Sequence, residues 1–280
     1  MIAPFPKPPH APKPKIKRLR KRRRMTICIG MLATDGIVLA ADSLESGGYL
    51  NRSVQKIMTW TVSSADGMPK HPATCMIAGA GDGGFIDAFQ MELIADVRGE
   101  MTMKEFESHA AAKINDFYSR HVFPFSSLDD GYDFSVLIGA TFGPQTRLYR
   151  TYKTTLQTVR ELTTSIGFGM EYANEIKDYF PFSDVTHTEI SAAAIISKTK
   201  DCVSGCGKYT DVVSLHNYQV VPDEVSGSRV APPVHGLINR VPHQKIAQWE
   251  ASFQNLWKQR QATLYGELVE EELARQYFYT

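Results

Sequence analysis

The sequence has few cysteines and no metal-binding pattern. Only four of its 280 residues are cysteine, too few for a disulfide-stabilised secreted domain. Cys28 and Cys75 lie in apolar stretches typical of buried strands. The Cys202-x-x-x-Cys206 pair lacks a second pair, or a histidine, at zinc spacing. We therefore expect no metal and no other cofactor, and a reducing, cytoplasmic location.

Long apolar runs are also missing. No stretch of 18 or more apolar residues occurs, so we expect no membrane-spanning helix and no role at a membrane. The first residues contain no apolar segment of the kind that a secretory signal requires.

Acidic residues are absent from the first 24 positions, which carry ten Lys and Arg. The remaining 21 basic residues face 30 acidic ones, so the rest of the chain has a formal charge of −9. The leader is rich in proline up to Pro14 and basic from Lys15 to Arg24, a composition that predicts disorder. It has three interpretations: a propeptide that is removed, a translation start assigned upstream of Met25, or a basic arm that binds nucleic acid or another anionic surface.

A β-hairpin signal follows this leader. Thr26-Ile27-Cys28-Ile29-Gly30 precedes an Asp35-Gly36 turn, and the strand Ile37–Asp42 returns. This places a threonine at the head of the hairpin and a carboxylate on the returning strand. A threonine hydroxyl becomes a useful nucleophile when a base lies beside it, and its own free α-amine can be that base. The chemistry requires residues 1–25 to be absent from the active form.

The remaining patterns alternate in blocks of strands and helices, which predicts an α+β protein with face-to-face sheets and helices outside. Expected strands lie near Ser53–Trp60, Ala73–Ala78, Asp133–Thr141, Thr146–Tyr152, Gln157–Leu162 and Tyr209–Leu215; expected helices begin near Phe85, Thr102, Tyr172, Thr186 and Gln244. We divide the chain into a leader (1–25), one domain (26–221), and a linker with a C-terminal helical extension (222–280).

Five motifs, in the same order, resemble the proteasome-type β subunits, which are N-terminal-nucleophile (Ntn) hydrolases. They are spread over about two-thirds of the chain and comprise Thr26-x-x-x-Gly30 with Leu39–Asp42, Val54-Gln55-Lys56-Ile57, Ile77-Ala78-Gly79 with Gly81-Asp82, Asp201-x-x-Ser204-Gly205, and Tyr209–Val213. The resemblance implies a four-layer αββα sandwich, here with a C-terminal helix added. It also implies self-association into rings around a chamber that cleaves peptide or protein substrates. An unfoldase partner is not identified by any motif.

The resemblance also implies roles for individual residues. Thr26 would be the nucleophile and its amine the general base. Lys56 would favour the deprotonated hydroxyl electrostatically, and Asp42 would hold Lys56. The Gly79 N–H would donate to the developing oxyanion, an interaction typically worth about 3–4 kcal/mol.

Asp201 and Ser204 would hold the threonine amine and hydroxyl in register, and Ile77 would touch the substrate side chain. The sequence also departs from the pattern: Met25 replaces the usual glycine before the nucleophile, and Phe168 and Met170 stand where a serine is often found. The leading hypothesis is a threonine-type amide or peptide hydrolase. The alternatives are a non-catalytic ring subunit and, less favoured, a nucleic-acid-binding protein that uses the basic leader.

Overall fold

The computed structural model describes residues 26–47, 50–62, 73–125, 133–180, 183–203, 206, 207, 209–217 and 237–258. Within these ranges, none of the helices combines the length and the apolar character that crossing a bilayer would need.

The first of two five-stranded antiparallel sheets contains the hairpin that begins with Thr26. Its spatial order is β10-β1-β2-β11-β12. The strands are β1 (Ile27–Ala33), β2 (Gly36–Asp42), β10 (Thr163–Gly167), β11 (Thr210–His216) and β12 (Ile238–Arg240).

The hairpin turn differs from the expectation by one residue. Ala33 pairs with Gly36, so Thr34 and Asp35 form the turn and Gly36 is the first residue of β2. A Cβ at Gly36 would lie 2.4 Å from the Leu215 carbonyl oxygen. Gly36 is therefore required by the close approach of β11 rather than by the turn.

The second sheet has the order β5-β6-β7-β8-β9. Its strands are β5 (Ile57–Val62), β6 (Ala73–Gly81), β7 (Phe134–Phe142), β8 (Gln145–Tyr152) and β9 (Thr155–Thr158). A separate two-stranded hairpin, β3 (Leu44–Gly47) and β4 (Leu50–Ser53), lies between β2 and β5 in the chain. The expected strand Gln157–Leu162 is wrong in its bounds, because β9 ends at Thr158 and β10 begins only at Thr163.

The helices begin where capping residues predict. Asp82 accepts from the Gly84 and Phe85 amides at the start of α1, and Thr102 forms a capping box with Glu105 at the start of α2. The helical segments are α1 (Gly83–Ala95), α2 (Met103–Phe117), the π-helix η1 (Tyr118–Val122), η2 (Phe123–Phe125), α3 (Met170–Ile176), η3 (Lys177–Tyr179) and α4 (Val185–Cys202), with a further helix at 243–258.

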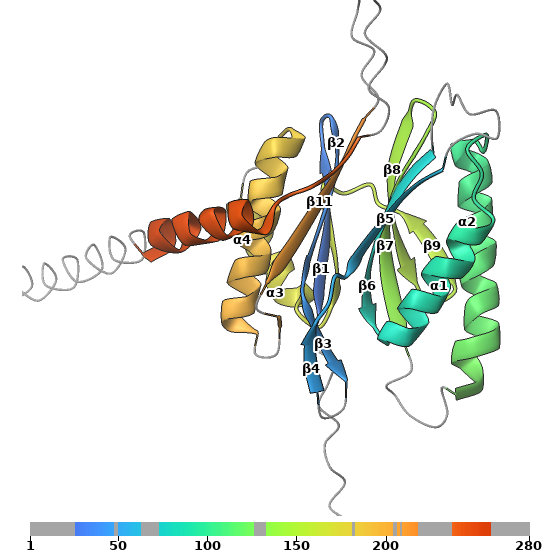
Figure 1. Ribbon diagram of the computed structural model, residues 1–280, viewed down its shortest axis with the longest axis horizontal. Coiled ribbons are helices and arrows are strands. Elements are labelled where there is room, and N and C mark those ends of the chain that lie inside the picture. The colour runs from blue at the N-terminus through green and yellow to red at the C-terminus, as the bar shows by residue number, and fades with distance from the viewer. Residues whose placement is uncertain are drawn as a thin grey trace, which may run out of the picture.

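These elements stack in four layers (Figure 1). Helices α1 and α2 cover the sheet of β5–β9 on one side, and α3 and α4 cover the other sheet. Between the sheets lies a core of apolar side chains, which includes Cys28, Leu39, Ala78 and Leu137. The structure confirms the αββα sandwich of the Ntn-hydrolase fold with an additional C-terminal helix.

The described part of the C-terminal region, residues 237–258, joins this architecture. Strand β12 pairs with β11, and Ile246 of the following helix is buried in the core against α4. Lys200 of α4 binds Glu250 of that helix at 2.8 Å. This helix therefore packs on its own chain through Ile246 and Glu250.

Candidate active site

The Asp42 carboxylate lies at the end of β2 and is fully buried. Oδ1 accepts from the Ile27 amide at 3.0 Å and from Lys56 Nζ at 2.7 Å. Oδ2 accepts from the amides of Leu44 at 3.1 Å and Gly207 at 2.6 Å. An ionised carboxylate only accepts hydrogen bonds, and a buried charge is tolerated when it is paired and fully hydrogen-bonded. These four donors satisfy both conditions.

Lys56 lies just before β5, and its side chain is only 8% exposed. Its ammonium group donates to Thr26 Oγ1 at 3.1 Å as well as to Asp42. The cation thus lies between the threonine oxygen and the carboxylate. A positive charge at this distance favours the ionised form of a neighbouring hydroxyl.

Two glycines surround the main chain of Thr26. The Gly169 amide donates to the Thr26 carbonyl at 3.4 Å. Gly167 has φ +95°, and a Cβ there would lie 2.2 Å from the same carbonyl oxygen. No other residue type fits Gly167 without moving the head of β1, because both its backbone conformation and its surroundings exclude a side chain.

The main chain of Gly79 is directed toward Lys56. Gly79 is opposite Val136 in the β6–β7 ladder, and the Val136 amide donates to Thr151 Oγ1 on β8. Opposed residues in an antiparallel ladder either bond each other or both point away. The Gly79 N–H therefore points to the β5 side. There the β5–β6 pairing ends at Ile57 and Ala78, so Lys56 is the next residue along the edge.

Side chains around Gly79 fix this part of β6. The Cys28 thiol donates to the Gly79 carbonyl at 3.3 Å. A Cβ on Gly79 would lie 2.5 Å from Ile86 Cγ2 in the first turns of α1. The close approach of α1 thus requires glycine at this position.

The structure brings Thr26, Asp42, Lys56 and Gly79 together, whereas Asp201 and Ile77 lie apart from them. Asp201 is exposed on the last turn of α4, and no hydrogen bond among the described residues joins it to Thr26. Ser204 lies outside the described residues. Ile77 is fully buried in the cluster that packs against α1 and α2, on the face of β6 opposite the core between the sheets. The roles of these three residues stay predictions.

The thiols near the site are poor nucleophiles. Burial raises the pKa of Cys28 to about 12, and burial followed by the Asp42 charge raises the pKa of Cys206 to about 11. The thiolate is the reactive form of cysteine. In the described part of the chain, no three His, Cys, Asp or Glu side chains gather in a way that could hold a metal ion.

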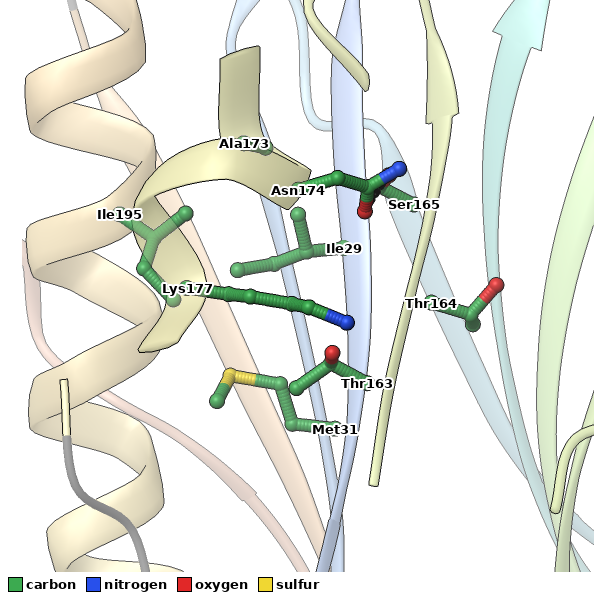
Figure 2. Close-up of a pocket in the computed structure, with 9 residues that line it drawn as sticks. All are labelled: Ile29, Met31, Thr163, Thr164, Ser165, Ala173, Asn174, Lys177 and Ile195. Atoms are coloured by element: carbon green, nitrogen blue, oxygen red, sulfur yellow. Dashed lines mark hydrogen bonds between the residues drawn. The ribbon is translucent and has the colours of Figure 1, made fainter. Parts of the chain in front are cut away.

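A surface hollow lies elsewhere, between the first sheet and α3 (Figure 2). Ile29, Met31 and Ala173 form its base, and Asn174 and Lys177 lie at its rim. Ile29 belongs to the apolar cluster on the helix side of β1, whereas Cys28 faces the other sheet. The hollow is therefore on the opposite face of β1 from the core between the sheets, and Thr26, Asp42 and Lys56 do not line it.

Some contacts of the site carry no sequence signal. The Leu44 and Gly207 amides that bind Asp42 are backbone groups, which every residue except proline possesses. Gly207 does have a steric signature in the structure, because a Cβ there would lie 2.2 Å from the Leu44 amide nitrogen. In the sequence, this contact is visible only as a glycine directly after Cys206.

Comparisons with known proteins support the fold class at low sequence identity. No family model and no curated protein matches the chain. Among solved structures, it is similar to Anbu (ancestral beta-subunit) from Yersinia bercovieri, with a TM-score of 0.63 and 16% identity over 86% of this chain and 97% of that one.

Two further Anbu structures match over most of both chains. The helical assembly of the Anbu complex from Pseudomonas aeruginosa has a TM-score of 0.62 at 17% identity, covering 88% of this chain and 96% of that one. The Anbu Gly-1 mutant from Hyphomicrobium sp. strain MC1 has a TM-score of 0.62 at 13% identity, covering 85% and 96%. The resemblance to a proteasome-type β subunit is therefore wrong as stated, because the likeness is to the Anbu type.

Proposed function

We propose that the protein is a threonine-type amide hydrolase, acting on peptides or proteins, with Thr26 as the nucleophile. The observation that carries this proposal is the contact of Lys56 Nζ with both Thr26 Oγ1, at 3.1 Å, and Asp42 Oδ1, at 2.7 Å. Lysine and aspartate side chains are rarely buried, and the end of a β-strand requires neither of them for its own structure. A hydroxyl needs an activating neighbour to act as a nucleophile, and the Lys56–Asp42 pair places a positive charge against the Thr26 oxygen.

The reaction would proceed in two steps. Thr26 Oγ1 attacks the scissile carbonyl carbon while its proton passes to the threonine amine, and the C–N bond then breaks as that proton moves to the leaving nitrogen. Water next attacks the ester and releases the acid, which regenerates the hydroxyl. The Gly79 N–H would stabilise the oxyanion in both steps. The Lys56 ammonium would lower the cost of the charge developing on Oγ1.

This mechanism needs a free amine on Thr26. In the sequence Met25 precedes it, so we further propose that residues 1–25 are removed from, or never present in, the active form. The solved helical assembly of Anbu from Pseudomonas aeruginosa supports self-association of this chain as well.

A peptide epoxyketone tests the proposal, because it closes a ring through the hydroxyl and the amine of the same residue. Intact mass spectrometry should show a protein that begins at Thr26 and gains one equivalent of the probe. Thr26→Ala should abolish labelling and peptide hydrolysis, whereas the matched control Thr158→Ala, at an exposed position of β9, should retain both. Protein that begins at Thr26 but is not labelled would refute the proposal and favour a non-catalytic assembly subunit.

The nucleic-acid hypothesis concerns residues outside the described part. It predicts binding that weakens steeply with salt and is lost when residues 1–24 are deleted. Binding that survives the deletion would dismiss the leader as its cause.

A further inference from the structure

Arg240 extends from β12 into the space between the two sheets. It pairs with Val213 of β11, whose side chain belongs to the core between the sheets. Asp211, two residues earlier on β11, lies on the same face of that strand and is only 3% exposed. The Arg240 Nη1 group donates to both oxygens of this carboxylate. The guanidinium thus compensates a nearly buried charge at the edge of the first sheet.

The same guanidinium also contacts the second sheet. Its Nη2 group donates to the Ile57 carbonyl at 2.6 Å, across 183 residues of sequence. The Gln55 side-chain amide, placed with its oxygen toward the arginine, accepts from Nε at 2.9 Å and from both terminal nitrogens at 2.6 Å. This orientation puts an acceptor, rather than a second donor, opposite the guanidinium.

These two contacts lie on either side of Lys56 in the chain. Strand β5 is an edge strand, so one row of its backbone groups has no neighbouring strand to bind. Arg240 binds the Ile57 carbonyl, which lies on this open edge, and it also binds the Gln55 side chain. Ile57 directly follows Lys56 in the sequence, and Gln55 directly precedes it. The backbone from which the Lys56 side chain starts is thus fixed by a residue from the C-terminal region.

We propose that Arg240 is a positioning residue for Lys56, and that the C-terminal region is thereby part of the active site. The proposal rests on the proposed function of Thr26. Arg240 acts through Lys56, whose ammonium must stay within hydrogen-bond distance of both Thr26 Oγ1 and Asp42. A misplacement of about 1 Å in a catalytic group can cost on the order of 100-fold in rate.

The geometry explains why this position needs arginine. A planar guanidinium presents five donors in a fixed fork, so it can bind Asp211 through one nitrogen and Ile57 through another. A lysine ammonium is a single charge on a flexible stem. It can neutralise Asp211, but it has no second donor in a fixed direction to bind the Ile57 carbonyl at the same time.

The test compares the rate and the stoichiometry of epoxyketone labelling in variants whose chain begins at Thr26 and is otherwise complete. Arg240→Gln should slow labelling and kcat by about 10- to 100-fold. KM should stay within about twofold, because the proposed role of Arg240 is to position Lys56 and not to bind the substrate. Stoichiometry should remain one probe per chain. Arg240→Lys should recover stability but only part of the rate. The matched control Arg160→Gln, at an exposed position after β9, should behave as the unmodified protein.

A double variant separates positioning from simple stabilisation. Arg240→Gln with Asp211→Asn removes the buried charge pair together, so it should unfold at a urea concentration close to that of the unmodified protein, yet still react slowly. Recovery of the full rate in this variant would overturn the proposal, as would an unchanged rate in Arg240→Gln. If the unmodified protein, beginning at Thr26, is not labelled at all, the proposed function fails. If it is labelled and Arg240→Gln reacts equally fast, only the positioning role fails.

Discussion

Replacing Asp42 with asparagine should destabilise the protein strongly, whether or not it is an enzyme. The carboxylate is fully buried and receives four donors: Lys56 and the amides of Ile27, Leu44 and Gly207. Asparagine has the same size, but its NH₂ group would face two of these donors. It would also leave the Lys56 ammonium without a counter-charge at 8% exposure.

The magnitude follows from these contacts. Removing one partner of a buried ion pair typically costs about 3–5 kcal/mol. At about 2–4 °C per kcal/mol for a domain of this size, the melting temperature should fall by roughly 6–20 °C. Asp178→Asn, at an exposed position of η3, should stay within about 0.5 kcal/mol of the unmodified protein.

Urea unfolding followed by circular dichroism measures the effect, and a double-mutant cycle with Lys56→Met assigns it. Lys56→Met leaves Asp42 with its three backbone donors, so it should cost less than Asp42→Asn. The two changes should be less than additive, because each removes the same ion pair. A loss of under about 1 kcal/mol in Asp42→Asn, or full additivity, would show that the carboxylate is not held as described.

Three further predictions concern the surroundings of the site. Gly167→Ala should destabilise the protein by roughly 1–3 kcal/mol more than Gly143→Ala, because both have positive φ but only the first would place a Cβ 2.2 Å from another atom; equal urea midpoints would contradict the steric account. Gly79→Ala should abolish hydrolysis by displacing the donor N–H; because a Cβ there would lie 2.5 Å from Ile86 Cγ2, Ile86→Ala, which removes that atom, should destabilise the Gly79→Ala chain less than it destabilises the unmodified protein, and fully additive losses in urea unfolding would contradict this contact. Because the pKa of Cys206 is raised to about 11, only about one molecule in a thousand carries its thiolate at pH 8. Iodoacetamide should therefore modify exposed Cys202 first, and the reaction at Cys206 should accelerate as the pH rises toward 11. Peptide mapping that finds Cys206 alkylated first at pH 8 would show that the thiol is not held in its neutral form.

Much of the fold could be predicted because its signals are local. The capping residues Asp82 and Thr102 mark the starts of α1 and α2, and the two apolar runs on either side of a turn mark the β1–β2 hairpin. The β3–β4 hairpin was missed because its residues are largely polar. The expected strand Gln157–Leu162 is misplaced because β9 already ends at Thr158. Val159 continues the pairing with β8 through a single backbone hydrogen bond, to the Leu148 carbonyl.

The groups of the candidate site also differ in how far the sequence predicts them. The proximity of Thr26, Asp42 and Lys56 was expected from the family resemblance, which rests on the types and spacing of these side chains. The amides of Leu44 and Gly207 could not be expected, since backbone donors leave no mark on residue type. Arg240 was missed because it joins Ile57 across 183 residues, and no periodic pattern connects positions so far apart.

The fourth donor to Asp42 comes from position 207, which is 165 residues downstream. At a synthesis rate of about 5–20 residues per second, roughly 10–30 s separate the two on the ribosome. A nascent chain that has already exposed Thr26, Asp42 and Lys56 therefore lacks a group that holds them in place. Newly made molecules acquire this arrangement only late in synthesis, once α4 and the loop that follows it have emerged.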